Sequence, residues 1–421
     1  MHDPNVIVRI YYGRARAHGR VIALIAASIG SLTHLQGDMI PVAPPTGEQE
    51  EAVRALSERY IEKGEELEKV GDLKGAVLDF NEAIRVDPEN PEAYVRRGNA
   101  KLAMKDSDGA LDDFSEAVEV DGKYAEAYYR RGLVRQAKED YVGAMEDLTE
   151  AVEINPSRKE YFYDRGKLRF KVRDYPGAAE DFDRYSMMDR VAVGAILRRG
   201  LARFYAGDND KALEDFNKAL KMNPRIPHAY YLRALYKMNV KLYDGATVDF
   251  AKAISLNPEN GLYPFARGAL LYADGDHRGA RQDFERCKTF SSEGSLKDYV
   301  VLWIWLLDAW EYDLATAKAK LAHYYKIREF EVVDPWYGQI VRFLLGEMGE
   351  DAFLKDAEEF PRREHDERLS HAAFFAAQKR LMDKNDKAAQ RLLLVCVDKG
   401  HLGAFEFQAA RMQLGSSLAD E

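Results

Sequence analysis

The chain has 421 residues, of which 46% are hydrophobic and 31% charged, as expected for a folded chain of several domains or one elongated array. Its net charge of −10 argues against nucleic acid as the main partner, because phosphate binding needs a basic surface. The two cysteines, Cys287 and Cys396, lie far apart with no CxxC or zinc-ligand spacing, so no disulfide framework or metal site is predicted.

The first 45 residues differ from the rest of the chain. Four arginines precede an uncharged segment at 21–32, and a polar spacer that contains prolines follows it. This order is typical of a secretory signal followed by a linker, and the apolar run is shorter than the roughly 20 residues of a membrane span. We expect a signal peptide or hydrophobic leader at 1–36, a linker at 37–54, and a periplasmic or exported protein. An uncleaved membrane anchor and a cytoplasmic leader are the alternatives.

Residues 55–292 contain seven units of a pattern with a period of 34, counted from Ser57. Position 8 is glycine or alanine, position 20 is always alanine, and position 24 is phenylalanine or leucine. We expect two helices per unit, with small residues where they approach and the larger side chain filling the gap to the next pair. One such hairpin cannot bury its apolar stripe, so neighbours must stack.

This pattern resembles the tetratricopeptide repeat. The resemblance implies an all-α fold, a right-handed α-solenoid of stacked antiparallel helix hairpins. It also implies that the first helix of each hairpin lines the surface that binds partners.

A charge pattern accompanies the repeat. Position 23 is aspartate in all seven units, and position 7 is lysine once and arginine six times. If antiparallel neighbours mirror each other about their turns, each aspartate lies level with position 7 of its own unit and of the next unit. We interpret this as a structural charge ladder, with a ligand site as the alternative.

Read through the resemblance, the first helices predict an aromatic groove edged by guanidinium groups. Such a groove suits an extended or helical polypeptide with a carboxylate, since aromatic and arginine side chains dominate binding hot spots. Alternatively, the rings pack between repeats and the arginines are merely solvated. A receptor for acidic chaperone tails is disfavoured, because position 2 is glutamate in four units. The candidate groove residues are Arg96, Asn99, Tyr129, Arg130, Tyr163, Arg198, Tyr231 and Phe265.

Residues 293–421 lose the 34-residue phase but keep helical patterns, ending in a capping helix. All four tryptophans lie here, and the uncharged segment 299–307 predicts a helix that is apolar all round. Such a helix is either sandwiched in the array or covered by a partner. The tryptophan-rich segment, "DPWYGQIVRFLLGEMGEDAFL" and the closing "RLSHAAFFAAQKRLMDKNDKAAQRLLL" are similar to bacterial lipoproteins of the NlpI family. That resemblance implies an exported, dimeric adaptor that docks proteases and cell-wall enzymes, although the lipid-attachment cysteine is absent.

The sequence contains no HExxH, GxSxG, P-loop or dinucleotide fingerprint, so we predict no catalytic site, no metal and no cofactor. The function predicted is a non-catalytic scaffold of the bacterial envelope, which binds protein or peptide partners such as a protease or cell-wall hydrolase. Two alternatives stay open. One is a cytoplasmic cochaperone or regulatory scaffold, and the other is a divergent hydrolase or transferase with a site in the C-terminal third.

Overall fold

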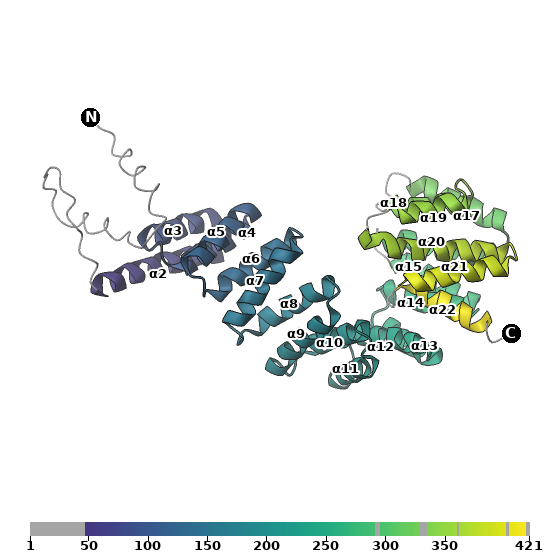
Figure 1. The fold of residues 1–421 in the computed structure, drawn as a ribbon, viewed down its shortest axis with the longest axis horizontal. Helices are drawn as coiled ribbons and strands as arrows, with labels where there is room; N and C mark the ends of the chain where they lie inside the picture. Colours follow the sequence, from purple (N-terminus) through teal and green to yellow (C-terminus); the bar gives the residue numbers. More distant parts are fainter. Residues whose placement is uncertain (1–46, 291–294, 329–334, 360–361, 401–403, 418–421) are drawn as a thin grey trace, which may run out of the picture. The chain divides into compact units, whose positions relative to one another are not determined.

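The computed structural model describes residues 47–290, 295–328, 335–359, 362–400 and 404–417, and every regular element within them is an α-helix (Figure 1). The predicted signal peptide and the first part of the linker lie outside the described residues. The helix α2 begins at Gly47, so residues 47–54, which the sequence assigned to the linker, are helical. None of the described helices combines the length and the apolar character that crossing a membrane requires.

Seven consecutive helix pairs span Gly47–Phe290, one for each predicted repeat. They confirm an all-α fold of stacked antiparallel hairpins. The pairs are α2 (Gly47–Lys69) and α3 (Leu73–Val86), α4 (Pro91–Ala103) and α5 (Ser107–Val120), α6 (Ala125–Ala137) and α7 (Tyr141–Ile154), α8 (Lys159–Lys171) and α9 (Tyr175–Met188), α10 (Val193–Tyr205) and α11 (Asn209–Met222), α12 (Pro227–Asn239) and α13 (Tyr243–Leu256), and α14 (Leu262–Ala273) and α15 (His277–Phe290).

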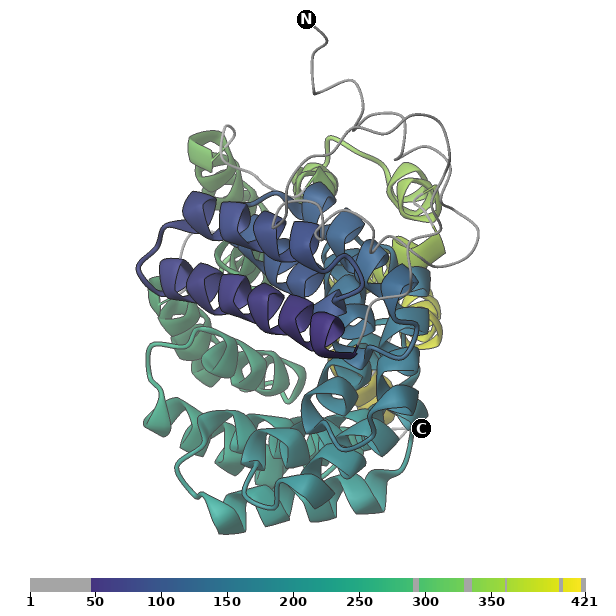
Figure 2. The ribbon, with the colours of Figure 1, turned by 90° about the vertical axis from the view of Figure 1, so that its left-hand side faces the viewer.

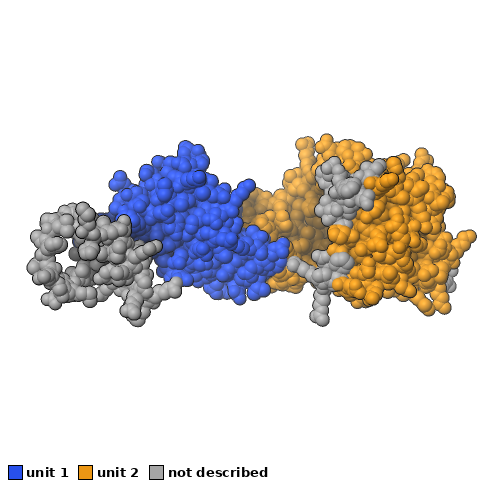
Figure 3. Space-filling view, turned by 90° about the horizontal axis from the view of Figure 1, so that it is seen from above, with its two compact units in different colours: residues 1–161 blue, residues 162–421 orange. Residues whose placement is uncertain are grey.

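The chain divides into two compact units, Met1–Tyr161 and Phe162–Glu421, coloured separately in Figure 3. The boundary falls inside α8. In unit 1 the helices of each pair contact each other and the next pair, and Figure 2 shows the purple helices of its first pair side by side. In unit 2 the pairs from α10 onward stack in the same way.

Local chemistry explains why each pair turns where it does. In five repeats an aspartate caps the second helix by accepting a hydrogen bond, 2.9–3.0 Å long, from the backbone N–H of a glycine three residues on. The residue before each of these five aspartates has a positive φ, between 64° and 85°, so the turn uses the left-handed conformation. The capping residues are Asp72, Asp106, Asp140, Asp174 and Asp276.

The glycine at position 8 lets the two helices of a pair approach closely. A Cβ atom added at Gly98 would lie 2.6 Å from the Phe114 ring, and one added at Gly132 would lie 3.1 Å from Leu148. The position-24 side chain is fully buried in both repeats. The close approach predicted from the small residues is therefore present.

Replacing Gly132 with leucine is expected to destabilise the third repeat by about 1–3 kcal/mol or more, because overpacking a tight helix contact forces the backbone apart. Hydrogen exchange of α6 and α7 measures this effect. Gly194, around which an added Cβ meets nothing within 4 Å, gives a matched control, and Gly194→Ala should leave exchange in unit 2 unchanged. A Gly132→Leu variant with wild-type exchange would show that the contact is loose.

The predicted charge ladder is present, but the second cation that binds each aspartate is not the predicted one. Each position-23 aspartate is buried and binds the position-7 cation of its own repeat, as Asp113 binds Arg97 at 2.6 Å. The second cation comes from position 11 of the same helix, as Lys101 does at 2.8 Å, and not from the next repeat. Position 11 supplies this second cation in repeats two to six; it is Leu67 in the first repeat and Leu271 in the seventh.

The arginine at position 7 instead reaches back to position 25 of the preceding repeat. Arg97 Nη1 donates to Asn81 Oδ1 at 2.7 Å, and Arg233 Nη1 donates to Asn217 Oδ1 at 2.8 Å. One arginine thus links two neighbouring repeats. These contacts give the ladder the structural role predicted for it.

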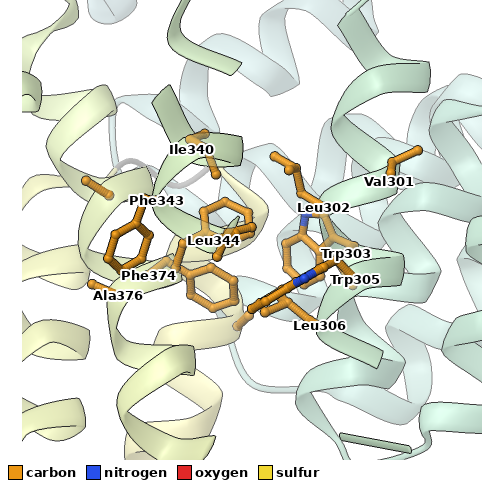
Figure 4. Packing of buried hydrophobic residues seen from close by; sticks show 14 of the residues in the cluster. Val301, Leu302, Trp303, Trp305, Leu306, Ile340, Phe343, Leu344, Phe374 and Ala376 are labelled. Carbon is orange, nitrogen blue, oxygen red and sulfur yellow. The ribbon is translucent and has the colours of Figure 1, made fainter. Parts of the chain in front are cut away.

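Seven further helices follow the repeats. The first, α16 (Ser295–Glu311), is packed between α14 and α15 on one side and the later helices on the other, so the sandwiched interpretation of the apolar segment is correct. In Figure 4 its Trp303 and Trp305 side chains point into the cluster that contains Phe374. The others are α17 (Leu314–Arg328), α18 (Pro335–Leu345), α19 (Glu350–Glu358), α20 (Arg362–Met382), α21 (Asp386–Lys399) and α22 (Phe405–Ser417).

Candidate protein-binding surface

Within each unit, first helices of neighbouring pairs contact each other: α2 with α4 and α4 with α6 in unit 1, and α10 with α12 in unit 2. We call the surface that these helices share the first-helix face. All eight residues predicted for the groove lie on first helices. The structure shows that they are not equivalent.

In unit 1 the two candidate arginines, Arg96 and Arg130, already form ion pairs with glutamates of the same face. Arg96 forms ion pairs of 2.8 Å with Glu92, four residues earlier on the same helix, and with Glu65 of the preceding repeat. Arg130 pairs with Glu126 at 2.6 Å in the same i,i+4 geometry. An incoming carboxylate would have to displace these glutamates. The arginines are therefore neither simply solvated nor free to bind a carboxylate.

Aromatic rings flank the Arg130 pair. The Tyr129 ring lies under the Arg130 guanidinium and 4.6 Å from the ring of Tyr161, centre to centre. Tyr161 donates a hydrogen bond of 2.9 Å to Glu126, and burial together with the Glu126 charge raises the pKa of Tyr161 to about 12. Asn99 is half-buried on α4. The network holds the Tyr129 ring in a fixed position on this face.

Unit 2 presents a different arginine. Arg198 is exposed, and its Nε donates a hydrogen bond of 2.9 Å to the hydroxyl of Tyr163 while its guanidinium lies over the Tyr163 ring. Among the described residues, no carboxylate lies within ion-pair distance of Arg198. Within the described part of the chain, the two terminal nitrogens of Arg198 therefore form no ion pair with a carboxylate.

The sequence accounts for the unpaired charge at Arg198. The residue four positions earlier is Gly194, where the second and third repeats carry Glu92 and Glu126. A Cβ added at Gly194 would meet nothing within 4 Å, so the space that a glutamate would fill is open. Loss of solvation and the Arg198 charge lower the pKa of the nearby His228, so this histidine is neutral at neutral pH and does not compete for an acid.

Two of the predicted groove residues have buried side chains. The exposed fraction of Phe265 is 1% and that of Tyr231 is 8%. The Phe265 ring packs edge-on against Trp303 and Phe405, and the Tyr231 ring lies 5.5 Å from that of Tyr263. The Tyr231 ring thus packs against the first helix of the next repeat, whereas the Phe265 ring packs against α16 and α22, which lie outside the repeats. Six of the eight predicted residues therefore remain accessible to a partner: Arg96, Asn99, Tyr129 and Arg130 in unit 1, and Tyr163 and Arg198 in unit 2.

Two potentially reactive groups of the C-terminal third, the Cys396 thiol and the Glu406 carboxylate, are buried. Burial raises the pKa of the Cys396 thiol to about 12, which outweighs its hydrogen bond with Ser370, so the thiol stays protonated and weakly nucleophilic. Glu406 is also buried. Within the described part of the chain, no cluster of histidine, cysteine and carboxylate side chains could hold a metal ion.

Comparison with known proteins supports the repeat assignment. One family model, described as a TPR repeat, matches residues 64–105, and another, described as a tetratricopeptide repeat, matches residues 95–159 and 197–246. The chain therefore contains tetratricopeptide repeats. A search of curated proteins found no match. The resemblance of the C-terminal third to NlpI lipoproteins stays a prediction.

Several solved structures are similar to parts of the chain. A tetratricopeptide repeat protein from Parabacteroides merdae is 21% identical over 58% of this chain and 97% of its own, with a TM-score of 0.45. YrrB, described as a TPR protein with an unusual peptide-binding site, is 24% identical over 44% of this chain and 95% of its own, with a TM-score of 0.42. The C-terminal part of a TPR repeat-containing protein from Cytophaga hutchinsonii is 16% identical over 57% and 98%, with a TM-score of 0.46.

Proposed function

Because the chain contains tetratricopeptide repeats, we propose that it is a non-catalytic scaffold that binds polypeptide partners on its first-helix face. Stacked repeats offer extended surfaces to other chains, and they are used for binding more than for bond chemistry. The observation that carries the proposal is the unpaired Arg198 guanidinium beside the Tyr163 ring. An aromatic platform next to an arginine that a partner can cover is the chemistry of an interface hot spot.

The ligand class follows from the charge. Arg198 has room and free donors for a carboxylate, whereas Arg96 and Arg130 are paired with glutamates. We propose that the partner inserts an aspartate, a glutamate or a terminal carboxylate at Arg198, and lays the flanking residues over Tyr163. An arginine–carboxylate contact of this kind is charge-assisted and directional.

The glutamate missing from the fifth repeat gives a direct test. Gly194→Glu should place a carboxylate next to Arg198, as Glu92 does next to Arg96. The resulting ion pair should compete with the carboxylate of a partner for Arg198. Acidic peptides selected from a random library on the wild-type protein should bind this variant about 10–100-fold more weakly, the equivalent of one lost charge-assisted hydrogen bond.

Gly194→Gln is the matched control, since it has the same size without the charge and should keep near-wild-type affinity. A glutamate in the first turn of α10 is favourable for the helix, so folding should be preserved in both variants. Equal affinity of the three proteins for the selected peptides would refute the Arg198 site. Failure of the library to yield any peptide would count against the scaffold itself.

We further propose that the scaffold acts in the bacterial envelope, where it brings a protease or cell-wall hydrolase near its client. The basic flank and short apolar run of the first 45 residues support export, and the similarity of the C-terminal third to NlpI lipoproteins supports the adaptor role. Cell fractionation tests the location. A strictly cytoplasmic pool of the full-length protein would favour the regulatory scaffold instead.

A further inference from the structure

The last helix of the chain lies on the surface that the other repeats offer to partners. α22 contacts α14, a first helix, and its Phe405 ring meets the Phe265 ring edge-on at 5.0 Å, centre to centre. Arg411 donates a hydrogen bond of 2.9 Å to the side chain of Asn239, at the end of α12. Figure 1 shows α22, in yellow, beside α14. Helix α22 therefore occupies the first-helix face of the last two repeats much as a bound peptide would.

The contacts that hold α22 combine polar and apolar groups. Glu406 and Gln408 are buried, and Glu406 accepts a hydrogen bond of 2.5 Å from Tyr299. Gln413 and Gln378 of α20 bond each other at 2.8 Å. Ala404, just before α22, and Phe407, Ala409 and Ala410 of α22 are buried as well. An apolar centre combined with hydrogen-bonded polar groups is typical of interfaces between polypeptides.

The second half of α22 is also less covered than the first. Residues 404–410 are buried except for the half-buried Phe405, while Arg411, Met412, Gln413 and Leu414 are all half-buried. A helix of 13 residues is marginal in water on its own, so its position depends on the contacts it makes with the rest of the unit.

We propose that α22 is an exchangeable internal ligand of the first-helix face of α12 and α14. When it leaves, the same surface binds an amphipathic helix of a second polypeptide that carries an aromatic side chain and, six residues later, an arginine, as Phe405 and Arg411 do. This site lies apart from Arg198, and the inference goes beyond the function proposed above. Through it, the C-terminal helix controls access to part of the scaffold.

The test uses the full-length protein and a fluorescent peptide of residues 404–417. In the wild-type protein, α22 competes with the peptide and apparent binding is weak, because only the open fraction can bind. Arg411→Ala raises the open fraction but leaves the receptor surface intact, so we expect about tenfold tighter binding of the peptide.

Asn239→Ala is the matched control on the receptor side. This substitution also increases the fraction of protein in which α22 has left the surface. It weakens the intrinsic binding of the added peptide by the same factor, so the two effects cancel and the apparent affinity should equal that of the wild-type protein. A peptide that itself carries Arg411→Ala should not show the tenfold tighter binding to the Arg411→Ala protein, because it cannot make the hydrogen bond to Asn239. Equal affinities of the wild-type protein and both variants for the peptide would overturn the proposal.

Hydrogen exchange provides the second measurement. The amides of α22 should exchange faster than those of α14 in the wild-type protein, and faster still in both variants, because the helix opens without unfolding of the unit. Exchange of α22 as slow as that of α14 in all three proteins would show that the helix is a fixed part of the core, and would refute the inference.

Discussion

Replacing Asp147 with alanine is expected to lower the free energy of unfolding of unit 1 by about 3–5 kcal/mol, the range measured when one partner of a buried ion pair is removed. Asp147 is 2% exposed and accepts from Arg131 at 2.7 Å and from Arg135 at 2.9 Å. Without the carboxylate, two largely buried guanidinium groups repel each other across the third repeat. Urea unfolding of the full chain, followed by hydrogen exchange of α6 and α7, measures the loss.

The first repeat supplies a control with the same residue at the same position. Among the described residues, Asp79 has one cationic partner, Lys63, whose side chain is 62% exposed and can return to water when the aspartate is lost. Asp79→Ala should therefore cost about 1 kcal/mol or less, as for an exposed pair. Equal losses in the two variants would mean that the second cation adds nothing, and that the ladder is not an electrostatic device.

Much of the repeat architecture can be predicted from residue types alone. The glycine at position 8 and the ring at position 24 meet as expected, because both lie on faces that the helical period places opposite each other. The mirrored positions also predict the first partner of each ladder aspartate correctly. They do not predict the second partner. Mirroring about a turn pairs positions on two different helices, whereas the two cations that share Asp147, Arg131 and Arg135, lie four residues apart on the same helix.

The candidate site is less predictable, although the sequence carries one signal for it. The run of glutamates at position 2 ends where Gly194 replaces the glutamate, and that change is enough to distinguish Arg198 from Arg96 and Arg130. The burial of Phe265 has no comparable signal. Its ring is covered by Phe405, 140 residues later in the chain, and a repeat pattern carries no information about a contact from outside the repeats.

A second large effect is expected at Trp303. This side chain is fully buried, and its ring meets Phe265 and Tyr272 of α14, Phe284 of α15 and Phe374 of α20. Trp303→Ala should lower the free energy of unfolding of unit 2 by about 3–5 kcal/mol, because α16 would lose its largest contact with both neighbouring layers. Hydrogen exchange resolved by unit should show faster exchange in α14 to α20 and unchanged exchange in α4 to α6.

Trp303→Phe separates packing from the polar atom. The indole Nε1 of Trp303 is buried and has no hydrogen-bond acceptor among the described residues, so part of what the tryptophan gains by packing is offset by an unsatisfied donor. Phenylalanine keeps a ring between the layers and removes that donor, and its cost should be less than half that of alanine. If Trp303→Phe destabilises unit 2 as much as Trp303→Ala, the indole must be bonded in solution, and α16 is held by a polar contact as well as by packing.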